Sequence, residues 1–126
     1  MKTLLVSGET ARLANLENTL VENEARVTRV RTGSEGMSEI AARSYDLVVA
    51  DEQLPDMTGL ELVRKVVLTH PMVNIAVVSS LSSDDFHEIS EGLGILMQLS
   101  PDPGHEEAET LVNHLNSILK MTRSGV

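Results

Sequence analysis

A single acidic residue at the end of an apolar run is the first feature of this sequence that could perform chemistry. In the segment YDLVVADEQLPDMTGLELV, an apolar stretch leads directly to Asp51, and a loop containing proline and glycine follows. A carboxylate whose backbone is fixed by a buried strand can act as an oxygen nucleophile towards phosphorus and form an aspartyl phosphate. Such phosphoryl transfer depends on positioning and charge neutralisation, so it needs a divalent cation and a nearby cation or hydroxyl group.

Small polar or acidic residues also follow two other apolar runs. The sequence SGE at positions 7–9 follows the first run, and the pair Ser79 and Ser80 follows a later one. Because the carboxyl ends of parallel strands lie at one edge of a sheet, we expect these groups to lie near Asp51. In the alternative interpretation, Asp51 only caps its loop and Ser79 is only a turn residue.

The elements that would position these groups follow from apolar periodicity, which predicts five strands alternating with five helices. Leu47–Ala50 and Ile75–Val78 are apolar throughout, as expected of strands covered on both faces. The other predicted strands are Thr3–Val6, Arg26–Val30 and Ile95–Leu99, and the predicted helices are Ala11–Val21, Ser34–Ala42, Leu60–Leu68, Asp84–Leu93 and Glu106–Met121. This alternation favours an α/β fold with a parallel sheet and helices on both faces.

Two of the predicted helices begin with capping signals. Thr58 and Glu61 have the spacing of a capping box, which places Gly59 in the first turn of the third helix. Ser82 or Ser83 is expected to cap the fourth helix, because a serine hydroxyl can accept a hydrogen bond from a free backbone N–H.

Length and composition indicate one domain. We predict that it spans residues 1–121 and that residues 122–126 form a tail. The chain has no cysteine, which excludes disulfides, a thiol nucleophile and zinc–thiolate sites. Its net charge of −9 argues against direct nucleic-acid binding, which requires a basic face.

Hydropathy gives no sign of a membrane segment. The apolar run near the amino terminus is too short for a signal peptide. No segment approaches the roughly 20 consecutive apolar residues that a membrane-spanning helix needs. We therefore expect a soluble cytoplasmic protein that does not bind membranes.

Three motifs occur in the same order as in a known family. The segment DLVVADEQLPDMTGLEL ends a buried strand at Asp51, NIAVVSSLS places Ser79 after the fourth strand, and GILMQLSP ends with Pro101. On these motifs the chain resembles a response-regulator receiver domain of two-component signalling, over about Thr3–Leu119. The resemblance implies a flavodoxin-like (βα)5 fold with strand order 2-1-3-4-5, Asp51 as phosphoacceptor and Ser79 as switch hydroxyl. It also implies a cis peptide bond between Ser100 and Pro101.

Several positions depart from the pattern of that family. Its members carry an acidic pair after strand 1 that holds Mg²⁺ together with the phosphoacceptor, and here these positions are Ser7 and Gly8. The lysine that contacts the phosphoryl oxygens is replaced by Ser100, and the aromatic switch position in strand 5 is Met97. Both electrostatic supports of the expected chemistry are therefore missing.

These departures weaken the predicted metal site. Asp51, the Gln53 carbonyl and water are the remaining candidate ligands for Mg²⁺. Glu9 is a further candidate ligand, although it lies one residue after the positions of the family's acidic pair. The side chain of Glu52 is expected to point away from that of Asp51, because side chains alternate along a strand. We predict that Mg²⁺ binding is possible but weak or absent, and the sequence indicates no other cofactor.

The predicted function is non-enzymatic signalling through protein–protein contacts by a degenerate receiver, or pseudo-receiver. The resemblance implies a histidine kinase or a downstream signalling protein as partner, bound through helix 4, strand 5 and helix 5. Two alternatives stay open. In the first, Asp51 still accepts phosphate from a histidine kinase. In the second, the rim around Ser7, Gly8, Asp51 and Ser79 binds a small ligand.

Overall fold

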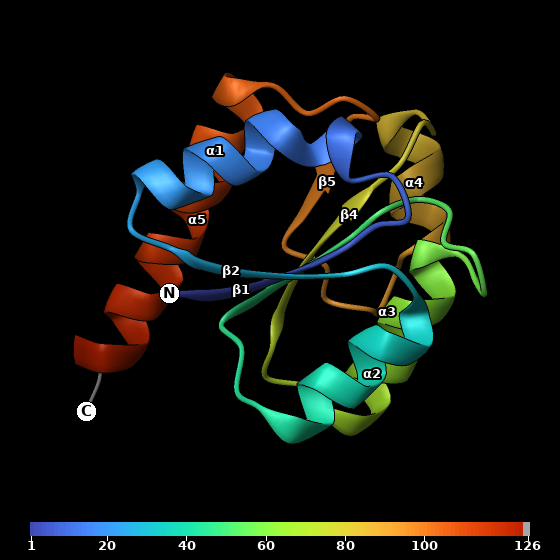
Figure 1. Cartoon of the computed structure of the whole chain (residues 1–126), viewed down its shortest axis with the longest axis horizontal. Helices are drawn as coiled ribbons and strands as arrows, with labels where there is room; N and C mark the ends of the chain where they lie inside the picture. The colour runs from blue at the N-terminus through green and yellow to red at the C-terminus, as the bar shows by residue number, and fades with distance from the viewer. Residues whose placement is uncertain (125–126) are drawn as a thin grey trace.

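The computed structural model describes residues 1–124 and contains a five-stranded parallel sheet between two layers of helices (Figure 1). The strands are β1 (Lys2–Val6), β2 (Arg26–Val30), β3 (Leu47–Ala50), β4 (Asn74–Val78) and β5 (Met97–Leu99). They lie in the order β2-β1-β3-β4-β5, and every neighbouring pair is parallel. The predicted α/β class, flavodoxin-like topology and strand order are therefore confirmed.

Helices cover both faces of the sheet. They are the 3₁₀ helix η1 (Thr10–Leu13) and the α-helices α1 (Ala14–Glu22), α2 (Gly33–Ala42), α3 (Gly59–Thr69), α4 (Ser83–Ile89) and α5 (His105–Ser124). Helices α1 and α5 pack on each other on one face, and α2 and α3 lie on the opposite face (Figure 1). Helix α4 contributes Phe86 to the same side as α2 and α3.

The alternation of side chains along each strand produces two apolar cores. In β3, Val49 points into the core under α1 and α5, whereas Val48 points into the core under α2 and α3. All four residues of β3 are buried, as their continuous apolar character predicted. The two cores therefore hold the central strands from both sides and fix where their carboxyl ends lie.

The strand register places the carboxyl ends of the central strands side by side. Val6 in β1 pairs with Ala50 in β3, and Ala50 pairs with Val77 in β4. Because all strands run in the same direction, the loops that follow β1, β3, β4 and β5 meet at one edge of the sheet. This edge is the candidate functional rim.

The predicted caps of the third and fourth helices are confirmed. The Thr58 hydroxyl accepts a hydrogen bond from the backbone N–H of Glu61 at the start of α3. The Ser82 hydroxyl accepts one from the backbone N–H of Asp85 at the start of α4, so Ser82 rather than Ser83 is the cap.

Four elements have boundaries that differ from the prediction by more than one residue. The first helix begins with the 3₁₀ turn η1, and α4 ends at Ile89 instead of Leu93. The chain then turns through Gly92 and Gly94, which both have positive φ, and β5 starts at Met97 instead of Ile95. Helix α5 extends to Ser124, past its predicted end. The last two residues of the predicted tail, 125–126, lie outside the described residues.

The expected cis bond between Ser100 and Pro101 is wrong. Throughout residues 1–124 no peptide bond is cis, so this bond is trans. Trans is the lower-energy isomer of an X–Pro bond by about 0.5–1 kcal/mol.

Candidate functional site

Asp51 lies at the carboxyl end of β3, where the sheet fixes its backbone. Its N–H donates to the Val6 carbonyl of β1 at 2.9 Å, so the hydrogen bonding between β1 and β3 continues one residue past the end of β3. Gly59, in the first turn of α3, packs directly on the Asp51 carbonyl, because a Cβ added at Gly59 would lie 2.2 Å from that oxygen. Only glycine allows this approach. Asp51 is only 1% exposed.

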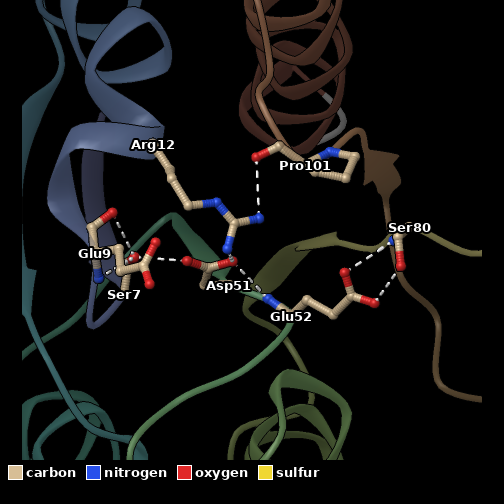
Figure 2. Close-up of polar contacts among 7 residues, drawn as sticks. All are labelled: Ser7, Glu9, Arg12, Asp51, Glu52, Ser80 and Pro101. Carbon is tan, nitrogen blue, oxygen red and sulfur yellow. Dashed lines mark hydrogen bonds and ion pairs between the residues drawn. The ribbon is translucent and has the colours of Figure 1, made fainter.

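Three groups of the protein engage the Asp51 carboxylate (Figure 2). The Ser7 hydroxyl donates to Oδ2 at 2.7 Å, and the backbone N–H of Glu52 donates to Oδ1 at 2.8 Å. The guanidinium of Arg12 places Nη1 3.5 Å from Oδ1 and forms an ion pair with it. Both carboxylate oxygens are therefore occupied by internal partners.

Arg12 also contacts the loop between β5 and α5. Its Nη2 donates to the Pro101 carbonyl at 3.2 Å, and Figure 2 shows the guanidinium between this carbonyl and Asp51. The side chain is 29% exposed, so part of its charge is removed from water. The sequence analysis did not identify Arg12 as a site residue. Its one signal is its place as the first cation after the carboxyl end of β1.

Ser79 lies at the carboxyl end of β4, as predicted, and is 6% exposed. Its N–H donates to the Leu99 carbonyl of β5 at 2.9 Å. Its hydroxyl accepts a hydrogen bond from the N–H of Leu81 at 3.2 Å. The sheet therefore places Ser79 one strand away from Asp51, with its hydroxyl used to shape the loop that leads to α4.

The carboxylate of Glu52 is directed away from Asp51, as the strand alternation predicted (Figure 2). It accepts hydrogen bonds from the backbone N–H and the hydroxyl of Ser80, at 3.0 and 2.7 Å. This contact links the end of β3 to the loop between β4 and α4.

Comparison with known proteins identifies the family. The family description "Response regulator receiver domain" matches residues 3–100, which is most of the chain. The chain belongs to the response regulator receiver family. Receiver domains are generally signalling modules rather than enzymes, and they interact with histidine kinases and other signalling proteins.

Two curated relatives are longer response regulators. The chain is 31% identical over 84 residues to the response regulator protein PilR of Pseudomonas aeruginosa, a match that covers 67% of this chain and 19% of PilR. It is 28% identical over 82 residues to the cell cycle response regulator CtrA of Brucella ovis, covering 65% of this chain and 35% of CtrA. The chain thus matches only 19% and 35% of the length of these two relatives.

Solved receiver structures share the fold. A CheY-like receiver domain protein from Methanospirillum hungatei superposes with a TM-score of 0.81 at 24% identity, covering 94% of this chain and 96% of that one. The signal receiver domain of an HD domain-containing protein from Pseudomonas fluorescens gives a TM-score of 0.83 at 19% identity, covering 99% and 93%. No helix within the described part of the chain has the length and apolar character needed to cross a membrane.

The residues around Asp51 in this receiver do not fit a Mg²⁺ ion. Mg²⁺ needs several hard oxygen ligands in near-octahedral geometry. Here the Ser7 hydroxyl donates a hydrogen bond to the Asp51 carboxylate, and a permanent cation, Arg12, already lies beside that carboxylate. Nowhere in residues 1–124 do three or more His, Cys, Asp or Glu side chains form a group that could hold a metal ion.

The two other predicted metal ligands lie in the loops of this rim. Gln53 forms an isolated antiparallel bridge with Thr58 in the loop between β3 and α3. Glu9 is exposed, and its backbone N–H donates to the Ser7 hydroxyl at 3.1 Å. Both roles as metal ligands stay predictions.

Ser100, which replaces the family's lysine, is directed towards α5. Its backbone N–H donates to the Glu107 carboxylate at 2.8 Å, and its hydroxyl donates to the same carboxylate. Glu107 lies in the first turn of α5. It also fixes the residue that precedes Pro101.

Asp56 in the loop after β3 has a structural role in this receiver. Its carboxylate accepts hydrogen bonds from the backbone N–H groups of Gly33 and Ser34, at 2.8 and 3.0 Å, and so caps the start of α2. These two bonds favour the ionised form and lower the pKa of Asp56.

Proposed function

We propose that this receiver domain signals through protein–protein contacts and that Mg²⁺-dependent phosphorylation of Asp51 is weak or absent. The observation that carries the proposal is the internal saturation of the Asp51 carboxylate by Ser7, Arg12 and Glu52. Phosphoryl transfer to a carboxylate requires a free oxygen and cations that neutralise the incoming group. At this rim both oxygens have partners, and the donor set for the metal is missing.

Three sets of contacts support the proposal that the loops of this rim keep one arrangement when no ligand is bound. Arg12 joins Asp51 to the loop after β5, and Glu52 joins the end of β3 to Ser80. Glu107 holds Ser100 on the other side of the same loop. A partner would therefore recognise a surface that does not depend on phosphorylation.

The proposed contact surface comprises α4, β5 and α5. A groove of about 370 Å³ lies between α4 and β5. Its lining combines apolar and polar side chains, including Phe86, His87, Ile95, Met97 and Gln98. Ile89 of α4 is 42% exposed, and residues next to it in the sequence line this groove. We propose a histidine kinase or a downstream signalling protein as the partner of this face.

Intact-mass measurement after incubation with a small phosphodonor tests the proposal. The parent is incubated with and without Mg²⁺, with Asp51→Asn as the control that removes the nucleophile. We expect no mass increase of one phosphoryl group in either protein. Mg²⁺-dependent labelling of the parent that is lost in Asp51→Asn would show that Asp51 is a working phosphoacceptor.

That outcome would favour the second candidate function, a phosphotransfer domain that accepts phosphate from a histidine kinase. One observation supports this candidate. Asp51 and Ser79 lie at the carboxyl ends of the neighbouring strands β3 and β4, the two positions that the family uses for phosphoacceptor and switch hydroxyl.

A further inference from the structure

Three segments that are far apart in the sequence meet at the Arg12 guanidinium. Arg12 belongs to η1, Asp51 follows β3, and Pro101 follows β5. One amino group of the guanidinium faces the Asp51 carboxylate, and the other donates to the Pro101 carbonyl (Figure 2). The contact with Pro101 spans 89 positions of sequence.

Asp51 needs a positive partner because its side chain is only 2% exposed. An ionised carboxylate removed from water is costly unless it is paired and hydrogen-bonded. A guanidinium is permanently charged, planar and able to donate in two directions at once, which an ammonium group does less well. Unlike a metal ion, it cannot dissociate from the protein.

We propose that Arg12 is a resident counter-ion that takes the place of a dissociable metal at Asp51 and couples the charge of Asp51 to the position of the loop between β5 and α5. This inference rests on the proposed function, because it names how the same rim is held without phosphorylation. Arg12 is a positioning residue. It acts on the Pro101 carbonyl, in the loop that joins β5 to α5, two elements of the proposed contact surface.

Neighbouring contacts limit how this loop can respond. Ser100 is held by Glu107 of α5, so the segment next to Pro101 is fixed at one end by α5 and at the other by Arg12. Loss of the Arg12 contact would therefore displace the loop locally, without releasing α5. Ser100 and Asp102, which flank Pro101, are the residues whose backbone amides report this displacement.

A double-mutant cycle tests the counter-ion role. Unfolding equilibrium constants are measured by urea denaturation, with a chelator and no Mg²⁺, for the parent, Arg12→Gln, Asp51→Asn and the double variant. We expect Arg12→Gln to raise the unfolding constant on the order of 10- to 100-fold in the parent, because it leaves a buried charge unpaired. In the Asp51→Asn background the same change should alter it less than about threefold. Equal effects in the two backgrounds would overturn the proposal.

Arg43→Gln is the matched control for loss of one positive charge. Arg43 pairs with Glu39 at 3.0 Å, but its side chain is 72% exposed. We expect this variant to change the unfolding constant less than about threefold, because exposed ion pairs contribute little. An effect as large as that of Arg12→Gln would mean that net charge, not the buried pair, is responsible.

NMR amide shifts test the coupling to the loop. Arg12 contacts both the Asp51 carboxylate and the Pro101 carbonyl, so Asp51→Asn should move the amide resonances of Ser100 and Asp102 if Arg12 transmits the change. We expect shifts there in both Asp51→Asn and Arg12→Gln. Unchanged resonances in Asp51→Asn would refute the coupling.

Arg12→Lys keeps the inference testable if Arg12→Gln does not fold. It retains the positive charge but not the two-way donor geometry of the guanidinium. We expect its stability to lie close to that of the parent, while the Ser100 and Asp102 resonances still shift. Unshifted resonances in Arg12→Lys would overturn the proposed coupling of Asp51 to the loop through Arg12.

The two proposals fail in different experiments. Phosphoryl labelling of Asp51 would overturn the proposed function but leave the coupling energy intact, because the cycle contains neither donor nor metal. An additive cycle would overturn the counter-ion role even if Asp51 were never labelled.

Discussion

Substitution of Ser7 by aspartate is a direct test of the electrostatics at this rim. The Ser7 hydroxyl lies 2.7 Å from Oδ2 of Asp51, and both residues are almost completely buried. Ser7→Asp therefore removes a hydrogen-bond donor and places a second carboxylate beside the first. Ser7→Asn is the matched control, because asparagine has nearly the same shape as aspartate, carries no charge and can still donate a hydrogen bond.

The size of the effect follows from Coulomb's law and the lost hydrogen bond. Two unit charges about 4 Å apart repel by about 4 kcal/mol at an effective dielectric constant of about 20. A hydrogen bond to a charged group contributes about 1.5–3 kcal/mol, and Ser7→Asp also loses that bond. Arg12, 3.5 Å from Asp51, offsets part of the repulsion. We expect Ser7→Asp to be about 2–4 kcal/mol less stable than Ser7→Asn near neutral pH.

Urea denaturation of the two variants, with and without Mg²⁺, is the assay. The parent and Ser7→Asn should not respond to Mg²⁺, because they lack the carboxylates that would bind it. Equal stability of Ser7→Asp and Ser7→Asn would refute the reasoning, since it would mean that the new carboxylate is not confined beside a charged Asp51.

Restoration of the full family pattern extends the same test. The variant Ser7→Asp, Gly8→Asp, Ser100→Lys should be less stable than the parent without metal and stabilised by Mg²⁺. A site with a millimolar dissociation constant gives about 1.4 kcal/mol at about 10 mM Mg²⁺. It should also be phosphorylated by a small donor, whereas the parent should not. Equal labelling of both would mean that the missing residues are not the cause of inactivity.

Space at Gly8 limits this design. A Cβ at Gly8 would lie 3.3 Å from Cδ and Cγ of Pro55, which is tight, although the backbone does not have a positive φ. Gly8→Ala measures the steric part alone. The difference between Gly8→Ala and Gly8→Asp then isolates the effect of charge.

Two further predictions concern buried and capping groups outside the rim. Thr3 is fully buried and its hydroxyl has no hydrogen-bond partner, so Thr3→Val should be neutral or stabilising by up to about 1–2 kcal/mol in urea denaturation. Thr19→Val is the control, for which we expect a change in stability of the opposite sign. Its hydroxyl contacts the Asn15 carbonyl and a ring nitrogen of His105, so its loss should destabilise by about 1–2 kcal/mol.

For Asp56, backbone N–H bonds lower the pKa of the folded state, so the stabilisation is present above its unfolded pKa of about 3.9 and is lost as pH falls below it. Asp56→Asn should therefore be less stable than the parent at pH 7, and the difference should narrow in acid. A constant difference across this range would contradict the capping role.

The fold could be predicted from the sequence because its signals are local. The continuous apolar character of Leu47–Ala50 and Ile75–Val78 indicated central strands, and both segments are buried on both faces. The capping signal at Thr58 placed the start of α3. The boundaries of α4 and β5 were less well predicted, because the positive φ angles of Gly92 and Gly94 end the regular pattern without an apolar signal.

The cation of the site could not be predicted in the same way. Arg12 lay within a predicted α-helix, next to Leu13, where periodicity assigns it to the solvent-facing side. The chain instead forms the 3₁₀ turn η1 there, which advances about 120° per residue rather than about 100°. The partner of Arg12 at Pro101 is also remote in sequence. The family's cation comes from the end of strand 5, whereas the cation of this chain comes from the segment after β1.

Charge balance gives a physical reason why these differences occur together. In the family's pattern, three carboxylates face a divalent metal ion and one lysine, so the occupied site is neutral. In this chain one carboxylate, Asp51, faces one guanidinium, Arg12, and the pair is neutral without any metal. A lysine at position 100 or an acid at position 7 would each disturb that balance. The Ser7, Gly8 and Ser100 differences are therefore consistent with one compensated change, in which a permanent cation replaces an exchangeable one.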